Sequence, residues 1–283
     1  QAPAENMPLT DQDLNGIPPA PADAVRIAVI DTGVDYQHEG LGGYIFRKPD
    51  ELNEGDDDDN CYPDDPIGVD FSTTLLPRNN PMDNHGHGTH VAGTILGLDR
   101  LTNDTIGVAY EAKWMSGIAL SGSCDNNTST AGITGMFQWA LNPDGNPATT
   151  DDIPDVINNS WRSGSTFCDA DGVFETYDAL YAAGIAVVFS AGNDGPSPET
   201  ITPPKFNNWD LVRLFSVGNL NANNPSLTIS SGSSRGPSIC GGTGSLLIKP
   251  EVSAPGSTVR SAYVGGEYSF LSGTSMAAPH VSG

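Results

Sequence analysis

The sequence predicts an α/β fold, with a three-layer, doubly wound and mostly parallel sheet that carries helices on both faces. Short apolar runs, typical of buried parallel strands, recur along the chain. Segments suited to helices lie between them, and this alternation is typical of crossover helices that cover a parallel sheet. The 283 residues suffice for one domain with a sizeable core.

Each expected strand is an apolar run that ends at polar or turn-forming residues. The clearest is Val25–Ile30, which leads directly into Asp31-Thr-Gly. The other expected strands are Trp114–Leu120, Val156–Asn159, Ile185–Ser190 and Leu214–Val217. Helices are expected over His87–Gly97, Ile133–Leu141 and Val173–Ala183, with a fourth that starts near Ser275.

The chain contains no internal repeat and no linker that would divide it. Residues 1–24 are proline-rich and are expected to form an irregular N-terminal segment, followed by one domain over residues 25–283. The first residues contain neither an initial methionine nor a signal segment, which favours a processed, mature N-terminus. No run of 18 apolar residues occurs, so no membrane span is expected.

The net charge is -23, from 35 acidic and 12 basic residues. Such a surface repels nucleic acid and anionic membranes, and neither is expected as a partner. The acidic residues are spread along most of the chain, which favours a solvated surface over the alternative of an acidic docking face.

Four cysteines occur, at Cys61, Cys124, Cys168 and Cys240. An even number in an exported chain predicts disulfides, with three possible connectivities. No C-x-x-C pair is present, so cysteine ligation of a metal is not expected. Free structural thiols remain an alternative.

Three glycine-rich motifs bring together the side chains that serine catalysis requires. They begin at Asp31, at His87 and at Gly273, and read Asp-Thr-Gly, His-Gly-Thr-His-Val-Ala-Gly and Gly-Thr-Ser-Met-Ala. Acyl transfer needs a hydroxyl, an imidazole that takes its proton and a carboxylate that fixes the imidazole tautomer. We therefore predict Ser275 as nucleophile and Asp31 as the orienting carboxylate. The residues alone leave His87 and His90 as equal candidates for the base.

The three motifs resemble those of the subtilisin-like family of serine peptidases. The resemblance runs from about Val25 to Gly283, and it favours the bacillopeptidase F-like branch through Asp155–Trp161 and Lys249–Gly256. It implies a subtilisin-like fold with His87 as the base. It also assigns a structural role to His90. We expect His38, His85 and His280 to be structural as well. A metal site of His85, His87 and His90 is the competing interpretation, but no matching set of carboxylates accompanies them.

The resemblance assigns Asn193 as the side-chain donor to the oxyanion, with the backbone N–H of Ser275 as the second donor. The alternative for Asn193 is a turn former, since Asn-Asp-Gly is good turn chemistry. The function implied is that of a secreted serine endopeptidase, which hydrolyses peptide bonds through an acyl-enzyme on Ser275 and whose activity rises with pH as the imidazole loses its proton.

The same resemblance implies that substrate adds as a strand between Leu120–Asn126 and Ser160–Gly164. The expected substrate-binding residues are Leu120, Ser121, Gly122, Ser160, Trp161, Arg162, Ser190, Ala191 and Gly192. Arg162 stands where relatives have glycine, and it either favours acidic substrate residues or points outward into solvent. The segment Thr202–Phe206 resembles one that holds a cis proline, at Pro203 or Pro204. An ordinary trans turn is the alternative, and trans is the commoner state of any single X–Pro bond. Protein or peptide substrates and the chain's own propeptide are the expected partners of a monomer.

An acidic segment, Gly55–Asp65, contains six aspartates. It resembles a calcium-binding segment of some relatives, with Asp56, Asp58, Asn60 and Asp65 as the expected ligands, although Cys61 replaces a glycine. A bare acidic loop is the alternative. Calcium would be structural, and no cofactor is expected for catalysis.

Two other functions compete with the endopeptidase. One is a peptide ligase or macrocyclase that uses the same acyl-enzyme with an amine acceptor. The other is a catalytically silent fragment, scaffold or calcium-dependent adhesion module. The chain ends at Gly283, eight residues after Ser275. The resemblance implies further structure after the nucleophile's helix, so the domain is expected to be truncated at its C-terminus.

Overall fold

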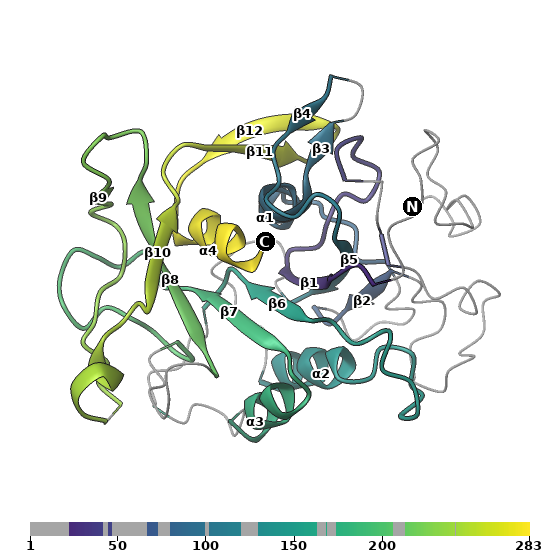
Figure 1. The fold of residues 1–283 in the computed structure, drawn as a ribbon, viewed down its shortest axis with the longest axis horizontal. Helices are drawn as coiled ribbons and strands as arrows, with labels where there is room; N and C mark the ends of the chain where they lie inside the picture. The colour runs from purple at the N-terminus through teal and green to yellow at the C-terminus, as the bar shows by residue number, and fades with distance from the viewer. Residues whose placement is uncertain are drawn as a thin grey trace.

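A computed structural model describes residues 23–41, 45–46, 67–72, 80–99, 102–119, 130–162, 168, 174–205, 213–240 and 242–283. The predicted irregular segment, residues 1–24, lies almost wholly outside these ranges. Within them, helices cover both faces of a mostly parallel sheet (Figure 1). The predicted three-layer α/β class is therefore confirmed.

The central sheet has the strand order β10-β8-β7-β6-β1-β5-β2, and β9 pairs with β8. Its strands are β1 (Arg26–Asp31), β2 (Gly68–Asp70), β5 (Lys113–Ile118), β6 (Val156–Asn159), β7 (Ala186–Ser190), β8 (Phe215–Asn221), β9 (Thr228–Ile229) and β10 (Val252–Pro255). Neighbouring strands are parallel except for the antiparallel pair of β8 with β9. The carboxyl ends of the parallel strands therefore meet at one edge of the sheet.

The helices are α1 (His87–Leu96), α2 (Thr130–Ala140), α3 (Phe174–Ala182) and α4 (Thr274–Ser282). Figure 1 shows α1 and α4 on one face of the sheet and α2 and α3 on the other. Strand β1 explains this burial, because successive side chains of a strand point to opposite faces. Ile27 and Val29 pack in the cluster that includes α1, whereas Ala28 and Ile30 pack in the cluster beneath α2 and α3.

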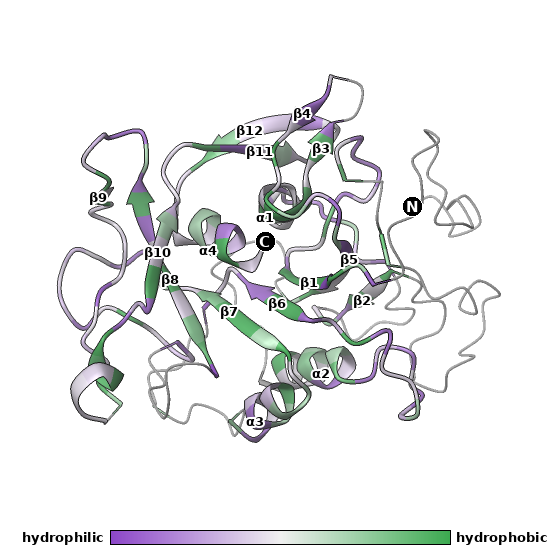
Figure 2. Cartoon of the chain, in the orientation of Figure 1, coloured by the Kyte–Doolittle hydropathy of each residue, from purple (hydrophilic) through white to green (hydrophobic). Residues whose placement is uncertain are grey.

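The strands of the sheet differ in hydropathy. In Figure 2 the strand β7 is green over most of its length, whereas much of β6 is purple. The polar part of β6 includes Asn158 and Asn159, which are fully buried and hydrogen-bonded. Asn158 accepts a hydrogen bond from Ser282 of α4, so the polar end of β6 anchors that helix.

The sequence did not predict two antiparallel hairpins. One pairs β3 (Leu98–Asp99) with β4 (Asp104–Thr105), and the other pairs β11 (Val259–Tyr263) with β12 (Glu267–Leu271). A short 3₁₀ helix spans Gly244–Leu247. Cys168 and Cys240 form a disulfide, while Cys61 and Cys124 lie outside the described residues. In the described part of the chain, no helix has the length and apolar character that crossing a membrane requires.

Candidate active site

Three neighbouring strands end in the polar residues that the sequence singled out. Asp31 is the last residue of β1, Ser160 follows β6, and Asn193 lies three residues after β7. Strand β6 lies between β1 and β7 in the sheet. These residues therefore share one edge of the sheet, the place where open α/β folds bind ligands.

Asp31 and His87 form the closest polar contact of the site. His87 Nδ1 lies 2.6 Å from Asp31 Oδ1, which also accepts a hydrogen bond of 2.8 Å from the N–H of Thr32. The Asp31 side chain is fully buried and that of His87 is 11% exposed. Because the carboxylate can only accept, Nδ1 carries the hydrogen, and Nε2 of a neutral ring then presents a lone pair.

The residues after His87 explain how its helix approaches Asp31. A Cβ atom on Gly88 would lie 2.0 Å from the carbonyl oxygen of Gly33, so only glycine allows this contact. The Thr89 hydroxyl donates to Asp83 Oδ2 at 2.6 Å and accepts from the N–H of Asp35 at 3.0 Å. The His-Gly-Thr motif thus fixes the start of α1 against the loop that follows β1.

His90, the other candidate for the base, contacts the β11–β12 hairpin and not Asp31. Its ring is buried, and Nε2 contacts the carbonyl oxygens of Val259 and Ser269 at 3.0 and 3.2 Å, which join α1 to the β11–β12 hairpin. Burial lowers the pKa of His90 to about 4 against the opposing effect of these carbonyls, so the ring is neutral at pH 7. The contact to Asp31 belongs to His87, and His90 has the structural position that the resemblance implied.

Two of the other predicted structural histidines, His38 and His280, also bond to the main chain. His38 Nε2 lies 2.9 Å from the carbonyl oxygen of Glu267, and His280 Nδ1 lies 2.9 Å from that of Met276. No group of three or more histidine, cysteine or acidic side chains in the described ranges has an arrangement that could hold a metal ion. The alternative metal site of His85, His87 and His90 therefore gains no support.

Ser275 occupies the second position of α4, because the helix begins at Thr274 and its N-cap is Gly273. Ser275 therefore lies inside the first turn of the helix, and Gly273 is the residue that caps it. The Ser275 hydroxyl donates to the carbonyl oxygen of Ser160 at 3.2 Å. In return, the Ser160 hydroxyl donates to the carbonyl oxygen of Ser275 at 3.0 Å. These bonds join the end of β6 to the start of α4, which also packs against α1.

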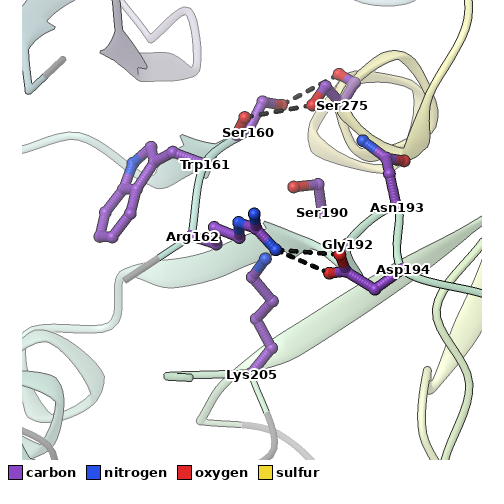
Figure 3. Close-up of a pocket in the computed structure, with 9 residues that line it drawn as sticks. All are labelled: Ser160, Trp161, Arg162, Ser190, Gly192, Asn193, Asp194, Lys205 and Ser275. Carbon is purple, nitrogen blue, oxygen red and sulfur yellow. Dashed lines mark hydrogen bonds and ion pairs between the residues drawn. The ribbon is translucent and has the colours of Figure 1, made fainter. Parts of the chain in front are cut away.

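Asn193 is held by Thr274. The N–H and the hydroxyl of Thr274 each donate to Asn193 Oδ1 at 3.0 Å. Figure 3 shows the amide nitrogen of Asn193 on the side of Ser275. The amide donor thus faces the nucleophile candidate because its oxygen is already engaged.

A cavity of about 260 Å³ opens beside Ser275. Among the residues that the structure describes, the cavity is lined by Ser160, Trp161, Arg162, Ser190, Gly192, Asn193, Asp194, Lys205 and Ser275. Five of the predicted substrate-binding residues are among these: Ser160, Trp161, Arg162, Ser190 and Gly192. Ala191 is fully buried and packs with Ile201. The described residues do not include Leu120, Ser121 and Gly122, nor the predicted calcium ligands Asp56, Asp58, Asn60 and Asp65.

Trp161 and Arg162 contribute differently to this cavity. The Trp161 ring is buried against Phe137 and Phe189, with ring centroids 6.4 and 5.3 Å apart, and Figure 3 shows it turned away from Ser275. Arg162 Nη1 reaches both carboxylate oxygens of Asp194, at 3.0 and 2.8 Å. Arg162 is therefore neither a bare attractive cation nor a purely solvated side chain, but half of an ion pair at the cavity.

Sequence reasoning missed Asp194 and Lys205. Asp194 was interpreted only as part of a turn, and Lys205 only as part of the segment with a cis proline. That cis bond is Pro203–Pro204, which assigns it to Pro204. The chain folds Lys205 inward from this segment, and its side chain is 1% exposed. No local signal of hydrophobicity or spacing identifies a lysine as buried.

Comparison with known proteins places the chain in a family. Residues 22–283 match the Subtilase family. Bacillopeptidase F of Bacillus subtilis (strain 168) is 35% identical over 269 residues, which are 90% of this chain but only 16% of that protein. Subtilisin DY of Bacillus licheniformis is 32% identical over 267 residues, or 92% of this chain and 74% of the relative.

Solved structures agree with this assignment. Sphericase superimposes with a TM-score of 0.69 and 28% identity, over 92% of this chain and 75% of that one. A psychrophilic protease superimposes with a TM-score of 0.68 and 27% identity, over 97% and 80%. The fold, the motifs and these similarities agree, and the chain belongs to the subtilase family.

Proposed function

We propose that this chain is the catalytic domain of a secreted serine endopeptidase. Ser275 Oγ attacks the carbonyl carbon of a peptide bond, and His87 Nε2 takes the hydroxyl proton. The resulting oxyanion accepts hydrogen bonds from Asn193 Nδ2 and the N–H of Ser275. His87 then protonates the leaving amine, and water hydrolyses the acyl-enzyme by the reverse sequence of proton transfers.

The observation that carries the proposal is the 2.6 Å contact between Asp31 Oδ1 and His87 Nδ1, beside the helix that bears Ser275. A buried carboxylate in this position fixes the imidazole tautomer and stabilises the imidazolium that forms when the ring takes a proton. The bonds of Asn193 to Thr274 add a second, independent support, because they aim a donor amide toward Ser275. Membership of the subtilase family supports the same chemistry.

The proposed attack requires one rearrangement. The Ser275 hydroxyl donates to the carbonyl oxygen of Ser160, so it has to turn toward His87 before its proton can be transferred. Hydroxyl rotation about one side-chain bond is fast on the scale of enzyme turnover. The proposal therefore places the Ser160 contact in the resting state and not in the reacting state.

Export from the cell is part of the proposal. A disulfide between Cys168 and Cys240 suits an oxidising compartment, because cytosolic thiols are kept reduced. The net charge of -23 is compatible with a freely diffusing, well-solvated enzyme.

Labelling with a fluorophosphonate tests the proposal. The reagent should modify the protein at Ser275, and digestion with mass spectrometry should locate it there. Ser275→Ala should abolish labelling, whereas Ser226→Ala, at an exposed position that does not line the cavity, should retain it. Absence of labelling in folded wild-type protein would contradict the proposal. Product analysis with an added amine acceptor distinguishes hydrolysis from ligation, since a ligase would yield mainly the amide product.

A further inference from the structure

The described residues include two fully buried lysines with different surroundings. Lys249 Nζ contacts a carboxylate oxygen of Glu251 and the carbonyl oxygen of Leu214. Lys205 is 1% exposed, and the part of the chain that the structure describes shows no hydrogen bond or ion pair for its Nζ. Figure 3 shows the side chain beside those of Arg162 and Asp194. A buried ammonium without a partner is costly. This difference makes Lys205 a candidate for binding a group that comes from outside the chain.

Lys205 lines the cavity beside Ser275, and Figure 3 shows its ammonium group directed toward Arg162 and Asp194. Arg162 is bound to Asp194 through both carboxylate oxygens, so the charges of this pair offset each other. The formal charge of these three side chains is therefore +1 when Lys205 is protonated. A pocket with this charge, in a chain whose net charge is -23, is a local departure from the rest of the molecule.

We propose that this pocket binds the side chain of aspartate or glutamate at the substrate residue that precedes the cleaved bond, and that Lys205 is the main residue determining this preference. The inference rests on the proposed function, since it takes Ser275 and Asn193 as the point of attack. Both line the same cavity as Lys205. A substrate carbonyl held at Ser275 therefore directs the adjoining side chain into the space that Lys205 borders.

The physical chemistry favours an acidic side chain over a neutral one of the same shape. A carboxylate supplies an acceptor for Lys205, for which the described residues provide no hydrogen bond, and a charged hydrogen bond in a site with little water is stronger than a neutral one. Burial, together with the charge of Arg162, lowers the pKa of Lys205 to about 7 against the opposing effect of Asp194. A bound carboxylate would raise it again, so binding of substrate favours the protonated lysine.

The carboxylate of Asp194 would repel an acidic substrate side chain. Its ion pair with Arg162 offsets this negative charge. Arg162 and Asp194 are 44% and 42% exposed, so the pair sits at the mouth of the cavity and not at its buried end. An entering carboxylate meets a neutral pair first and the lysine beyond it. Removing the arginine would leave the Asp194 carboxylate to be offset by Lys205 alone, and the preference should be lost.

Cleavage of matched peptides tests the proposal. The peptides differ only in the residue before the cleaved bond, which is Glu, Gln, Asp, Asn or Leu. The ratio of kcat/KM for Glu over Gln should be about ten to a hundred, a range expected for one charged contact after desolvation. A ratio near one, or a preference for Leu over Glu in enzyme that a fluorophosphonate labels fully, would overturn the inference and leave the proposed function standing.

Three variants identify the residue responsible. Lys205→Met should bring the Glu to Gln ratio to about one. Arg162→Gln should lower it toward one, because Asp194 then offsets Lys205, and Asp194→Asn should increase it. Arg260→Gln is the matched control, because Arg260 pairs with Asp104 at 2.6 Å with similar exposure. It should keep the wild-type ratio. A Lys205→Met protein that retains the wild-type ratio would contradict the role of Lys205.

Binding to the Ser275→Ala protein separates the pocket from the chemistry. Peptide amides that end in Glu or Gln should differ about tenfold in Kd in calorimetry, with Glu the tighter. Failure of fluorophosphonate labelling together with this difference would reject the proposed function alone. Equal Kd values for both peptides in folded protein would reject the pocket assignment alone.

Discussion

Thr274 donates two hydrogen bonds, from its N–H and its hydroxyl, to the same oxygen of Asn193, each at 3.0 Å. The amide of Asn193 is therefore oriented before substrate arrives. Asn193→Asp keeps the size of the side chain but replaces the donor by an acceptor. We expect kcat to fall by about 10² to 10³, the loss measured for the equivalent donor of a subtilisin. Peptide hydrolysis measures it.

Thr274→Val is the matched variant for this claim. It removes the hydroxyl, and with it the bond to Asn193 Oδ1 and the bond that the hydroxyl accepts from the N–H of Gly192 at 3.1 Å, but it leaves the bond from the Thr274 N–H to Asn193. The decrease in kcat should therefore be smaller than for Asn193→Asp. Equal activity of Asn193→Asp and wild type would show that the amide does not act on the oxyanion.

Gly88 tests how the position of His87 depends on backbone contact. A Cβ atom there would lie 2.0 Å from the carbonyl oxygen of Gly33, and main-chain atoms cannot yield as a flexible side chain can. Gly88→Ala should lower the free energy of unfolding by about 3 kcal/mol or more and reduce kcat, because α1 moves away from Asp31. Urea denaturation and peptide hydrolysis measure the two effects.

Gly232→Ala is the control for this substitution, because a Cβ atom at Gly232 meets nothing within 4 Å. It should behave as wild type in both assays. A Gly88→Ala protein with unchanged stability would contradict the close packing of α1 on the loop after β1.

Buried His90 predicts acid destabilisation. Burial lowers its pKa to about 4, below the value of about 6.5 in an unfolded chain. The unfolded state therefore binds more protons between these values, so the stability is fully present above pH 6.5 and is lost as the pH falls toward 4. The loss from this residue is about 3 kcal/mol.

The measurement compares urea unfolding at pH 7.5 and pH 4. The decrease between these pH values should be about 3 kcal/mol smaller in His90→Gln, which cannot titrate. His85→Gln, at an exposed position, is the control. An identical decrease in His90→Gln and wild type would contradict the assignment.

Calcium removal tests the acidic segment Gly55–Asp65, for which the sequence alone supports a site. Its carboxylate and amide oxygens are the donors that calcium prefers. EDTA should lower Tm, and added Ca²⁺ should restore it whereas Mg²⁺ should not. Replacing both Asp56 and Asp58 by asparagine should remove the sensitivity to EDTA. A Tm that EDTA leaves unchanged would remove the calcium claim.

The sequence predicted the parts of the fold that depend on continuous apolar runs. Strand β6 has its predicted bounds, and the predicted helices agree with α1 to α4 within a few residues. The β11–β12 hairpin was missed because its strand Glu267–Leu271 is only partly buried and shows no clear alternation. Its position depends on distant contacts, such as those of His90, that local patterns do not encode.

The same distinction holds for the site. Asp31, His87 and Ser275 were singled out from the sequence because each belongs to a motif with specific chemistry, and the structure brings Asp31 and His87 into contact. The Arg162–Asp194 pair joins residues 32 positions apart, and Lys205 is buried although lysine is usually exposed. The burial and the pairing of such charged residues depend on contacts between distant segments, so they could be identified only from the structure.

The central claim is that Asp31 fixes the imidazole of His87 for Ser275. The most direct test is kcat for peptide hydrolysis by Asp31→Asn, in protein whose Tm shows that it is folded. The substitution preserves shape but permits the wrong imidazole tautomer, so kcat should fall by about 10⁴. A decrease of less than about tenfold would contradict the account. Tenfold corresponds to only about 1.4 kcal/mol of activation free energy, which is far below what the triad has to supply.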